Sequence, residues 1–172
     1  SADESAVEAC DGLDNDCDGA VDGGDSDIIA NRPLCELQQG QCNGAAKPLT
    51  LCTAQGWGTC TTAVYLAHAA AYEAGIEVSC DGKDNECDGF IDDEFAFTGK
   101  KVGQSCDGTG ACGNGLVECK ADGSSATCST NADGSQHQDV AETCNAVDDD
   151  CDGATDDGLG LAQSPCRKVG VC

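Results

Sequence analysis

Three short acidic segments have the spacing of a calcium-binding loop. Each places carboxylates at loop positions 1, 3, 5 and 9, a glycine at position 6, and at position 7 a residue whose carbonyl oxygen can bind a cation. The expected ligands are Asp14, Asp16, Asp18, Ala20 and Asp22 in the first copy, Asp84, Glu86, Asp88, Phe90 and Asp92 in the second, and Asp148, Asp150, Asp152, Ala154 and Asp156 in the third. Because hard carboxylate oxygens suit Ca²⁺, we expect about three calcium ions.

Position 12, which carries a bidentate glutamate in an EF-hand, differs among the copies. Asp25 occupies it in the first copy and is a further expected ligand, whereas Phe95 and Leu159 occupy it in the others. Acidic residues stand close to it there: Asp93, Glu94 and Asp157. An acidic residue also precedes each motif and could fold back onto the loop: Glu8, Glu77 or Glu142. Since the Cys-Asp-Gly entry is not a helix end, we predict EF-hand-like loops without the helices.

A cysteine occupies position 4 of every loop, where alternation points the side chain away from the ion. We expect each to form a disulfide with the cysteine seven residues earlier, which would clamp the loop before metal binds. The expected pairs are Cys10–Cys17, Cys80–Cys87 and Cys144–Cys151.

The composition indicates that cross-links must hold this chain together. Its 172 residues include 16 Cys, and 32 acidic residues face 8 basic ones, for a net charge of −24. So acidic a chain, with only 3% aromatic residues, would ordinarily be disordered, but this density of cysteine is typical of disulfide scaffolds. An even cysteine count without any Cys-x-x-Cys pair favours disulfides over zinc or redox motifs. We therefore expect a secreted protein, extracellular or at the cell surface.

The same features exclude several classes of function. A surface this acidic repels phosphate, so nucleic acid is not an expected partner. No apolar run approaches the ~18 residues of a membrane span. The sequence has neither a nucleophile elbow nor a phosphate-binding glycine loop, and its two histidines, His68 and His137, lie far apart. We therefore expect that the protein is not an enzyme.

Clusters of four cysteines alternate with the motifs. They are Cys35, Cys42, Cys52 and Cys60, then Cys106, Cys112, Cys119 and Cys128, and a partial cluster of Cys166 and Cys172 follows. The second cysteine of each cluster follows Gly-x. This order predicts segments at 1–25, 26–98, 99–160 and 161–172, each segment from 26 to 160 being a cysteine cluster with the motif that follows it. We expect copies of this protein or neighbouring repeats to join end to end through the Cys166/Cys172 end.

The expected fold is a small, disulfide-rich, metal-stabilised repeat protein, mostly loops and short β-hairpins, arranged as an elongated array. Gly, Asp, Asn and Ser interrupt nearly every stretch. One short helix is predicted at about 62–74, because the segment is rich in helix formers, begins at Thr62 as a possible N-cap, and ends before Gly75.

The repeated Cys-Asp-Gly-x-Asp-Asn-Asp/Glu-Cys-Asp-Gly-x-x-Asp segment resembles the metal-binding motif named after the MopE protein. Repeats of that motif resemble secreted and surface proteins of myxobacteria and related bacteria, which implies an extracellular bacterial protein that binds metal through the matched acids. The third copy departs from it at Asn145 and Ala146. The spacing also resembles the calcium loops of thrombospondins. Two functions remain: a calcium-binding structural protein, such as a surface layer, stalk, adhesin or filament subunit, or a secreted protein that sequesters copper or calcium.

Overall fold

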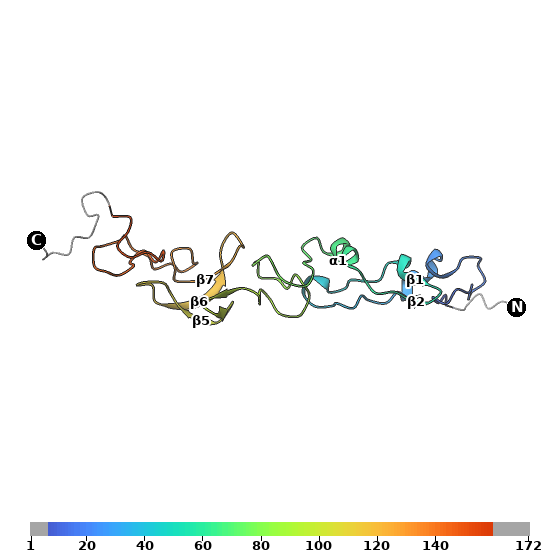
Figure 1. Ribbon diagram of the computed structural model, residues 1–172. Helices are drawn as coiled ribbons and strands as arrows, with labels where there is room; N and C mark the ends of the chain where they lie inside the picture. The colour runs from blue at the N-terminus through green and yellow to red at the C-terminus, as the bar shows by residue number, and fades with distance from the viewer. Residues whose placement is uncertain (1–6, 160–172) are drawn as a thin grey trace, which may run out of the picture. The chain divides into compact units, whose positions relative to one another are not determined.

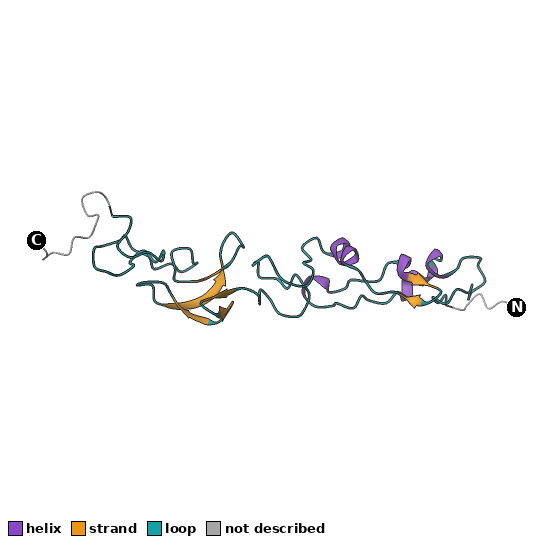
Figure 2. Cartoon of the chain, viewed as in Figure 1, coloured by secondary structure: helices purple, strands orange, loops and turns teal. Residues whose placement is uncertain are grey.

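The computed structural model describes residues 7–159, and loops make up most of them (Figures 1 and 2). Within this part of the chain there is one α-helix, α1 (Thr62–His68), and four short 3-10 turns: η1 (Asp22–Gly24), η2 (Asp27–Asn31), η3 (Gly40–Cys42) and η4 (Leu49–Leu51). The strands are β1 (Cys52–Thr53), β2 (Gly56–Trp57), β3 (Ala96–Phe97), β4 (Lys100–Lys101), β5 (Ser105–Asp107), β6 (Asn114–Cys119) and β7 (Ala126–Cys128). The predicted fold class, a disulfide-rich chain of loops and short hairpins, is confirmed.

All strand pairing is antiparallel and local. β1 pairs with β2, β3 pairs with β4, and β5, β6 and β7 form one three-stranded sheet in sequence order. Val117 in β6 lies opposite Cys128 in β7, and both are buried. Because such short strands bury little apolar surface, they need cross-links to persist.

The chain forms two compact units. The first runs to Ile76 and adds Lys83–Ile91, and the second consists of Glu77–Gly82 and the chain from Asp92 onward. The segments predicted from the repeat end at the edges of the motifs, whereas this division passes through the second motif.

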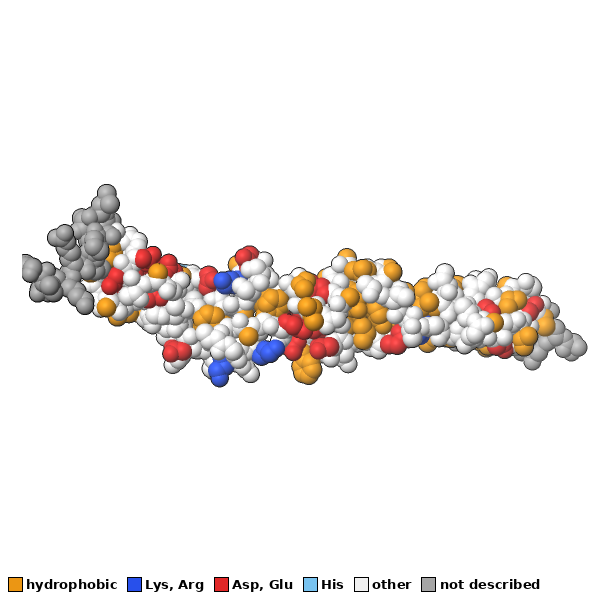
Figure 3. Space-filling view, in the orientation of Figure 1, with side chains coloured by type: hydrophobic (Ala, Val, Ile, Leu, Met, Phe, Trp, Pro, Cys, Tyr) orange, Lys and Arg blue, Asp and Glu red, His pale blue; other side chains and the backbone are white. Residues whose placement is uncertain are grey.

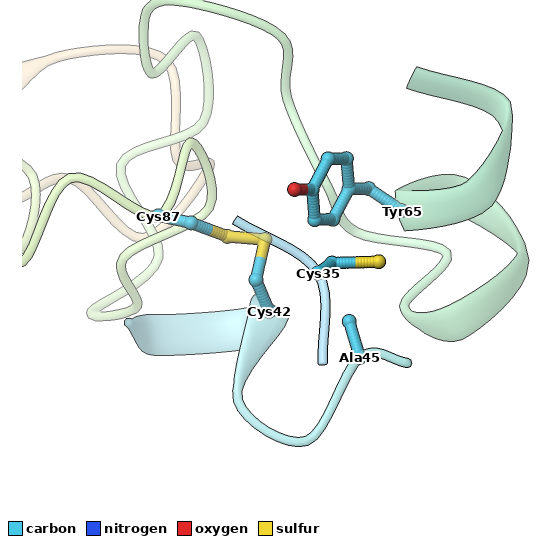
Figure 4. Close-up of a cluster of buried hydrophobic side chains, with 5 residues drawn as sticks. All are labelled: Cys35, Cys42, Ala45, Tyr65 and Cys87. Carbon is cyan, nitrogen blue, oxygen red and sulfur yellow. A yellow bond between two sulfur atoms is a disulfide. The ribbon is translucent and has the colours of Figure 1, made fainter. Parts of the chain in front are cut away.

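The core of the first unit is a cluster of sulfur atoms and one aromatic ring. Its buried members are Cys35, Cys42, Ala45, Tyr65 and Cys87, and Figure 4 shows Tyr65 of α1 beside the Cys42–Cys87 disulfide. The Tyr65 hydroxyl accepts a hydrogen bond from the backbone N–H of Leu37 at 3.0 Å. A core this small cannot replace the disulfides as the main source of stability.

The second unit has a comparable core beneath its three-stranded sheet. Its buried members are Cys106, Val117, Ala126 and Cys128, and three partly buried side chains pack against them: Phe95, Phe97 and Val102. Phe95 occupies position 12 of the second loop, so an apolar anchor stands where an EF-hand carries its bidentate glutamate.

Helix α1 is shorter than the predicted range of 62–74. It begins after Thr61, which is the N-cap in place of Thr62, and it ends at His68 because Ala69 takes an extended conformation. Beyond it, Tyr72 returns to stack against Tyr65 with the ring centroids 5.0 Å apart. Tyr72 packs against the buried cluster that contains Tyr65, so this tertiary contact accompanies the end of the helix before the alanine-rich continuation.

The predicted clamp disulfides are wrong. Cys10 bonds Cys52, Cys80 bonds Cys119, and the position-4 cysteines Cys87 and Cys151 bond Cys42 and Cys112. Cys17 is free and exposed. Cys144 is also disulfide-bonded, but not to Cys151.

The six disulfides that join described cysteines instead follow one pattern. The first cysteine of a motif bonds the third cysteine of the next cluster, and the first and fourth cysteines of each cluster bond each other, as Cys35–Cys60 and Cys106–Cys128. The second cysteine of a cluster bonds the position-4 cysteine of the following motif. These bonds therefore connect the second motif to the clusters before and after it, the first motif to the cluster after it, and the third to the cluster before it, and none of them closes a loop on itself. The predicted segment 161–172, with Cys166 and Cys172, lies outside the described residues.

Candidate metal centre

The carboxylate at position 1 is held in the same way in all three loops. One of its oxygens accepts a hydrogen bond from the backbone N–H of the position-6 glycine: Asp14 from Gly19 at 3.1 Å, Asp84 from Gly89 at 2.9 Å and Asp148 from Gly153 at 3.0 Å. Each of these glycines has a φ between +95° and +99°, which side-chain-bearing residues adopt at a cost. Glycine at position 6 is therefore required by the turn that brings the carboxylates together.

The carboxylates at positions 3 and 5 accept hydrogen bonds from the backbone N–H groups two residues later in the chain. Asp16 accepts from the N–H of Asp18 at 3.2 Å, and Asp18 accepts from the N–H of Ala20 at 2.7 Å. In the same way, Asp88 accepts from Phe90 and Asp152 from Ala154, both at 2.8 Å. These bonds use one oxygen of each carboxylate, so the second oxygen is available to a ligand.

Buried oxygen atoms without a hydrogen-bond partner mark where that ligand belongs. In the first loop they are Asp14 Oδ1 and Asp25 Oδ2, and in the third loop Asp148 Oδ1 and Glu142 Oε2. A buried carboxylate oxygen left unpaired is costly, and a cation removes the cost directly. The donor set therefore fits a metal ion, and it consists of hard oxygen ligands.

Two acids outside the regular spacing complete the first site. Glu8, only 4% exposed, folds back and accepts hydrogen bonds from the N–H groups of Asn15 and Asp22, both at 2.9 Å. Its carboxylate lies within 4.8 Å of Asp14 and Asp16. Asp25, at position 12, is 2% exposed and lies within the same distance of Asp16 and Asp18. The first loop thus brings five carboxylates together.

The third loop repeats this arrangement with its own upstream acid. Glu142 accepts hydrogen bonds from the N–H groups of Asp149 and Asp150. In the second loop, Asp84, Glu86 and Asp88 place one oxygen each within 4.8 Å of one another. Neither Glu8 nor Glu142 belongs to the twelve-position ligand pattern, and the signal that indicated them was an acid shortly before each motif.

The crowding of negative charge shows in the carboxyl pKa values. Burial raises the pKa of Asp16, and the neighbouring carboxylates of Asp18, Asp25 and Glu8 raise it further against an opposing backbone hydrogen bond. Burial likewise raises the pKa of Asp150, together with Asp152, Glu142 and Asp157. Asp157 therefore stands near the third site even though Leu159 holds position 12. Figure 3 shows acidic side chains in groups and not spread evenly over the face in view.

Position 9 has a structural task in the loop. Asp92 is 1% exposed and accepts hydrogen bonds from the N–H groups of Asp81 and Gly82, both at 2.9 Å. Asp22 accepts from Gly12, and Asp156 from Asn145 and Ala146, also at 2.9 Å. This side chain connects the end of the loop to its Cys-Asp-Gly entry. The loop is therefore closed by hydrogen bonds to the position-9 carboxylate and not by the disulfide that the sequence predicted.

The third copy keeps this closure in spite of its altered entry. Ala146 stands where the other copies have Gly12 and Gly82, and it has the same left-handed backbone, with φ +66° against +80° and +78°. An alanine in that region is strained by about 1 kcal/mol. The departure from the motif therefore affects the stability of the third loop and leaves its hydrogen bonds intact.

One group of potential ligand atoms, in the second unit, is not a metal site. Cys80, Asp92 and Cys119 lie within 4.8 Å of one another, but the two sulfur atoms form a disulfide. Nor do the histidines join the acidic loops: His68 Nε2 lies 3.0 Å from the carbonyl of Asn43, and His137 Nδ1 lies 2.6 Å from Asp139.

These features define a disulfide-stabilised protein with repeated acidic loops suited to metal ions. The family model Cu-binding_MopE, described as "Putative metal-binding motif", matches residues 3–23, 68–93 and 131–157, which confirms the resemblance seen in the sequence. No curated protein and no solved structure matches the chain. The many disulfides suggest an oxidising, extracellular environment. In residues 7–159, no helix has the length and apolar character needed to cross a bilayer.

Proposed function

We propose that this is an extracellular calcium-binding structural protein, rigidified jointly by Ca²⁺ and by disulfides, and that it is not an enzyme. The observation that carries the proposal is the unpaired, buried carboxylate oxygen at position 1 of the first and third loops, Asp14 Oδ1 and Asp148 Oδ1. Asp14 lies within 4.8 Å of Glu8 and Asp16, and in the third loop Asp152, Glu142 and Asp157 raise the pKa of Asp150, so both loops concentrate negative charge that a divalent cation would neutralise.

The chemistry of the ligands supports calcium over copper. Copper prefers imidazole or thiolate, but both histidines bind oxygen atoms elsewhere, the sulfur atoms of Cys87 and Cys151 form disulfides, and Cys17 is a single exposed thiol. Magnesium demands a tight octahedron, whereas five carboxylates around one loop suit the larger and more variable shell of calcium.

The connectivity supports a structural role over metal storage. Each motif is joined by at least one disulfide to a neighbouring cysteine cluster, so ordering a loop also restrains the cluster bonded to it. A module of this kind can work with weak sites, with dissociation constants of ~10⁻⁴–10⁻³ M, because extracellular calcium is abundant.

A melting experiment with metal titration tests the proposal. At a calcium concentration 100-fold above the dissociation constant, each site should add about 2.7 kcal/mol to the free energy of unfolding, so the melting temperature in calcium should exceed that in EGTA by several degrees. Asp14→Asn should reduce this calcium-dependent rise in melting temperature and lower the amount of bound calcium by one ion. Asp122→Asn removes the same charge from a turn outside the motifs, where Asp122 binds Ser124, and should change neither.

Two outcomes would contradict this function. Equal melting temperatures in calcium and EGTA would show that the loops do not use calcium for stability. Tight and selective uptake of copper, with little change in the melting temperature, would favour the sequestering protein instead.

A further inference from the structure

A hollow beside α1 combines apolar walls with two basic side chains. Its volume is about 370 Å³, which is within the range of pockets that hold small ligands. The basic side chains are Arg32 and His68, and no acidic side chain is among the described residues that line it. The other lining residues are small or apolar: Gly44, Ala46, Pro48, Ala63, Val64 and Ala67. The hollow therefore differs from the rest of a chain whose net charge is −24.

Both walls of the hollow are anchored in the protein. On one side, α1 is held by Tyr65 in the core of the first unit. On the other side, the lining residue Ala46 lies between Ala45, a member of the same core, and Lys47, which is buried and pairs with Glu36. An apolar group can therefore enter the hollow without the penalty of ordering its walls.

Arg32 has no partner of opposite charge in residues 7–159. Lys47, Lys101 and Lys120 each lie beside a carboxylate, whereas no described carboxylate lies within 4.0 Å of the Arg32 guanidinium. A guanidinium ion matches the geometry of a carboxylate and can donate two hydrogen bonds to it. The hollow therefore suits a ligand that carries an apolar group and a carboxylate side by side.

The second acidic loop exposes this combination. Phe90, at position 7, is 63% exposed, and the next residue, Ile91, is 57% exposed. The N–H of Phe90 donates to Asp88 Oδ1 at 2.8 Å, so a carboxylate is held close to Phe90. The other two loops have alanine at position 7, where a metal ion would need only the backbone carbonyl. The loop does not require the phenyl ring, and aromatic side chains are enriched at protein interfaces.

The second loop stays negatively charged even with a divalent ion bound. Asp84, Glu86 and Asp88 each place one oxygen within 4.8 Å of the others. These three carboxylates carry one negative charge more than a divalent cation neutralises. The loop can therefore attract a guanidinium ion with or without bound metal.

We propose that Phe90 of one copy of this chain occupies the hollow of a second copy, with Asp88 next to Arg32. The charges are complementary, and the ring supplies the apolar group that the alanine-lined walls lack. Phe90 does not fill the hollow of its own chain, because it is exposed. Each chain carries one ring and one hollow, so the contact is heterologous and repeats head to tail. This inference goes beyond the proposed function and does not depend on which ion the loops bind.

Sedimentation velocity over a range of protein concentrations tests the ring. Cys17 is alkylated in every sample, so that its free thiol adds no cross-links. The average mass of the wild type should rise with concentration. Phe90→Ala should weaken self-association at least ~30-fold, the loss typical of an interface hot spot. Leu13→Ala is the matched control, because Leu13 is 62% exposed on the first loop, and it should associate as the wild type does.

Phe90→Ala is also expected to fold and to bind metal normally. It gives the second loop the alanine that the first and third loops have at position 7, and it keeps the backbone carbonyl. Its melting temperature in calcium and its bound calcium should therefore equal those of the wild type. A loss of self-association in this variant then reports on the ring and not on the acidic loop.

A charge reversal and a mixing experiment test the hollow. Arg32→Glu should be monomeric, whereas Lys100→Glu, which makes the same charge change at an exposed residue of β4, should associate as the wild type does. A mixture of Phe90→Ala and Arg32→Glu should give a dimer and nothing larger, because only the first variant keeps the hollow and only the second keeps the ring.

Three results would overturn the inference: a wild type that stays monomeric, a Phe90→Ala variant that associates as strongly as the wild type, or a mixture of the two variants that stays monomeric. A monomeric wild type whose α1 resonances shift when phenylacetate is added would assign the hollow to a small aromatic carboxylate and would also rule out self-docking.

Discussion

Asp92 can be assigned two different roles. Its place at position 9 of the loop predicts a metal ligand, whereas its hydrogen bonds indicate that it stabilises the loop itself. Both of its oxygens accept hydrogen bonds, from the N–H groups of Asp81 and Gly82. We predict that Asp92→Asn destabilises the protein without removing a metal ion, because the amide keeps one acceptor and turns an NH₂ group toward the other donor.

The size of the effect follows from burial and from the two bonds. Asp92 is 1% exposed, so water cannot replace the lost acceptor. A hydrogen bond to a charged group contributes about 1.5–3 kcal/mol, and losing one of the two should cost about 2 kcal/mol. For a unit of this size, that corresponds to a fall in melting temperature of roughly 10 °C.

The assay is thermal unfolding in calcium and in EGTA, with the bound calcium counted by elemental analysis. Asp92→Asn should lower both melting temperatures by about the same amount and leave the calcium count unchanged. Asp88→Asn is the matched control, because it removes the same charge from an exposed position-5 acid of the same loop. It should reduce the calcium count and leave the melting temperature in EGTA nearly unchanged.

The opposite result for these two variants would refute the structural role of Asp92. If Asp92→Asn lost one calcium ion and melted normally in EGTA, Asp92 would be a ligand and the hydrogen bonds to the loop entry would contribute little.

Three further predictions concern pH and backbone strain. Because the pKa of Asp16 is raised above 3.8 in the folded protein, its protonation favours folding: metal-free wild type should gain melting temperature relative to Asp16→Asn as the pH falls toward that pKa, while the stabilisation by calcium shrinks, and the same holds for Asp150. A difference between wild type and Asp16→Asn that does not change with pH would contradict it. Ala146→Gly should raise the free energy of unfolding by about 1 kcal/mol in a denaturant titration, by removing left-handed strain, and no gain would contradict that strain. Gly110→Ala should destabilise far more than Gly158→Ala, because the two share φ values of +58° and +59° but only Gly110 faces a carbonyl 2.2 Å from the added Cβ; equal melting temperatures would refute the steric argument.

Much of the metal centre was predictable because its determinants are local. The alternate acids converge, and the glycine at position 6 adopts the required positive φ, since both depend on backbone geometry within a few residues. The spacing also placed Asp25 at position 12, and the fold brings its carboxylate within 4.8 Å of those of Asp16 and Asp18. It could not reveal the task of Asp92, because only the folded loop brings that side chain to the N–H groups of its own entry.

The sequence by itself determined that cysteines and carboxylates must replace a hydrophobic core, and that the acids form repeated loops. It did not determine which cysteines bond. Cys10 stands seven residues before Cys17, yet it bonds Cys52, because pairing depends on which sulfur atoms the fold brings together and not on separation along the chain. Only the tertiary structure connected the motifs to cluster cysteines 39 to 45 residues away, and only it left Cys17 exposed in the conformation of its bonded counterparts.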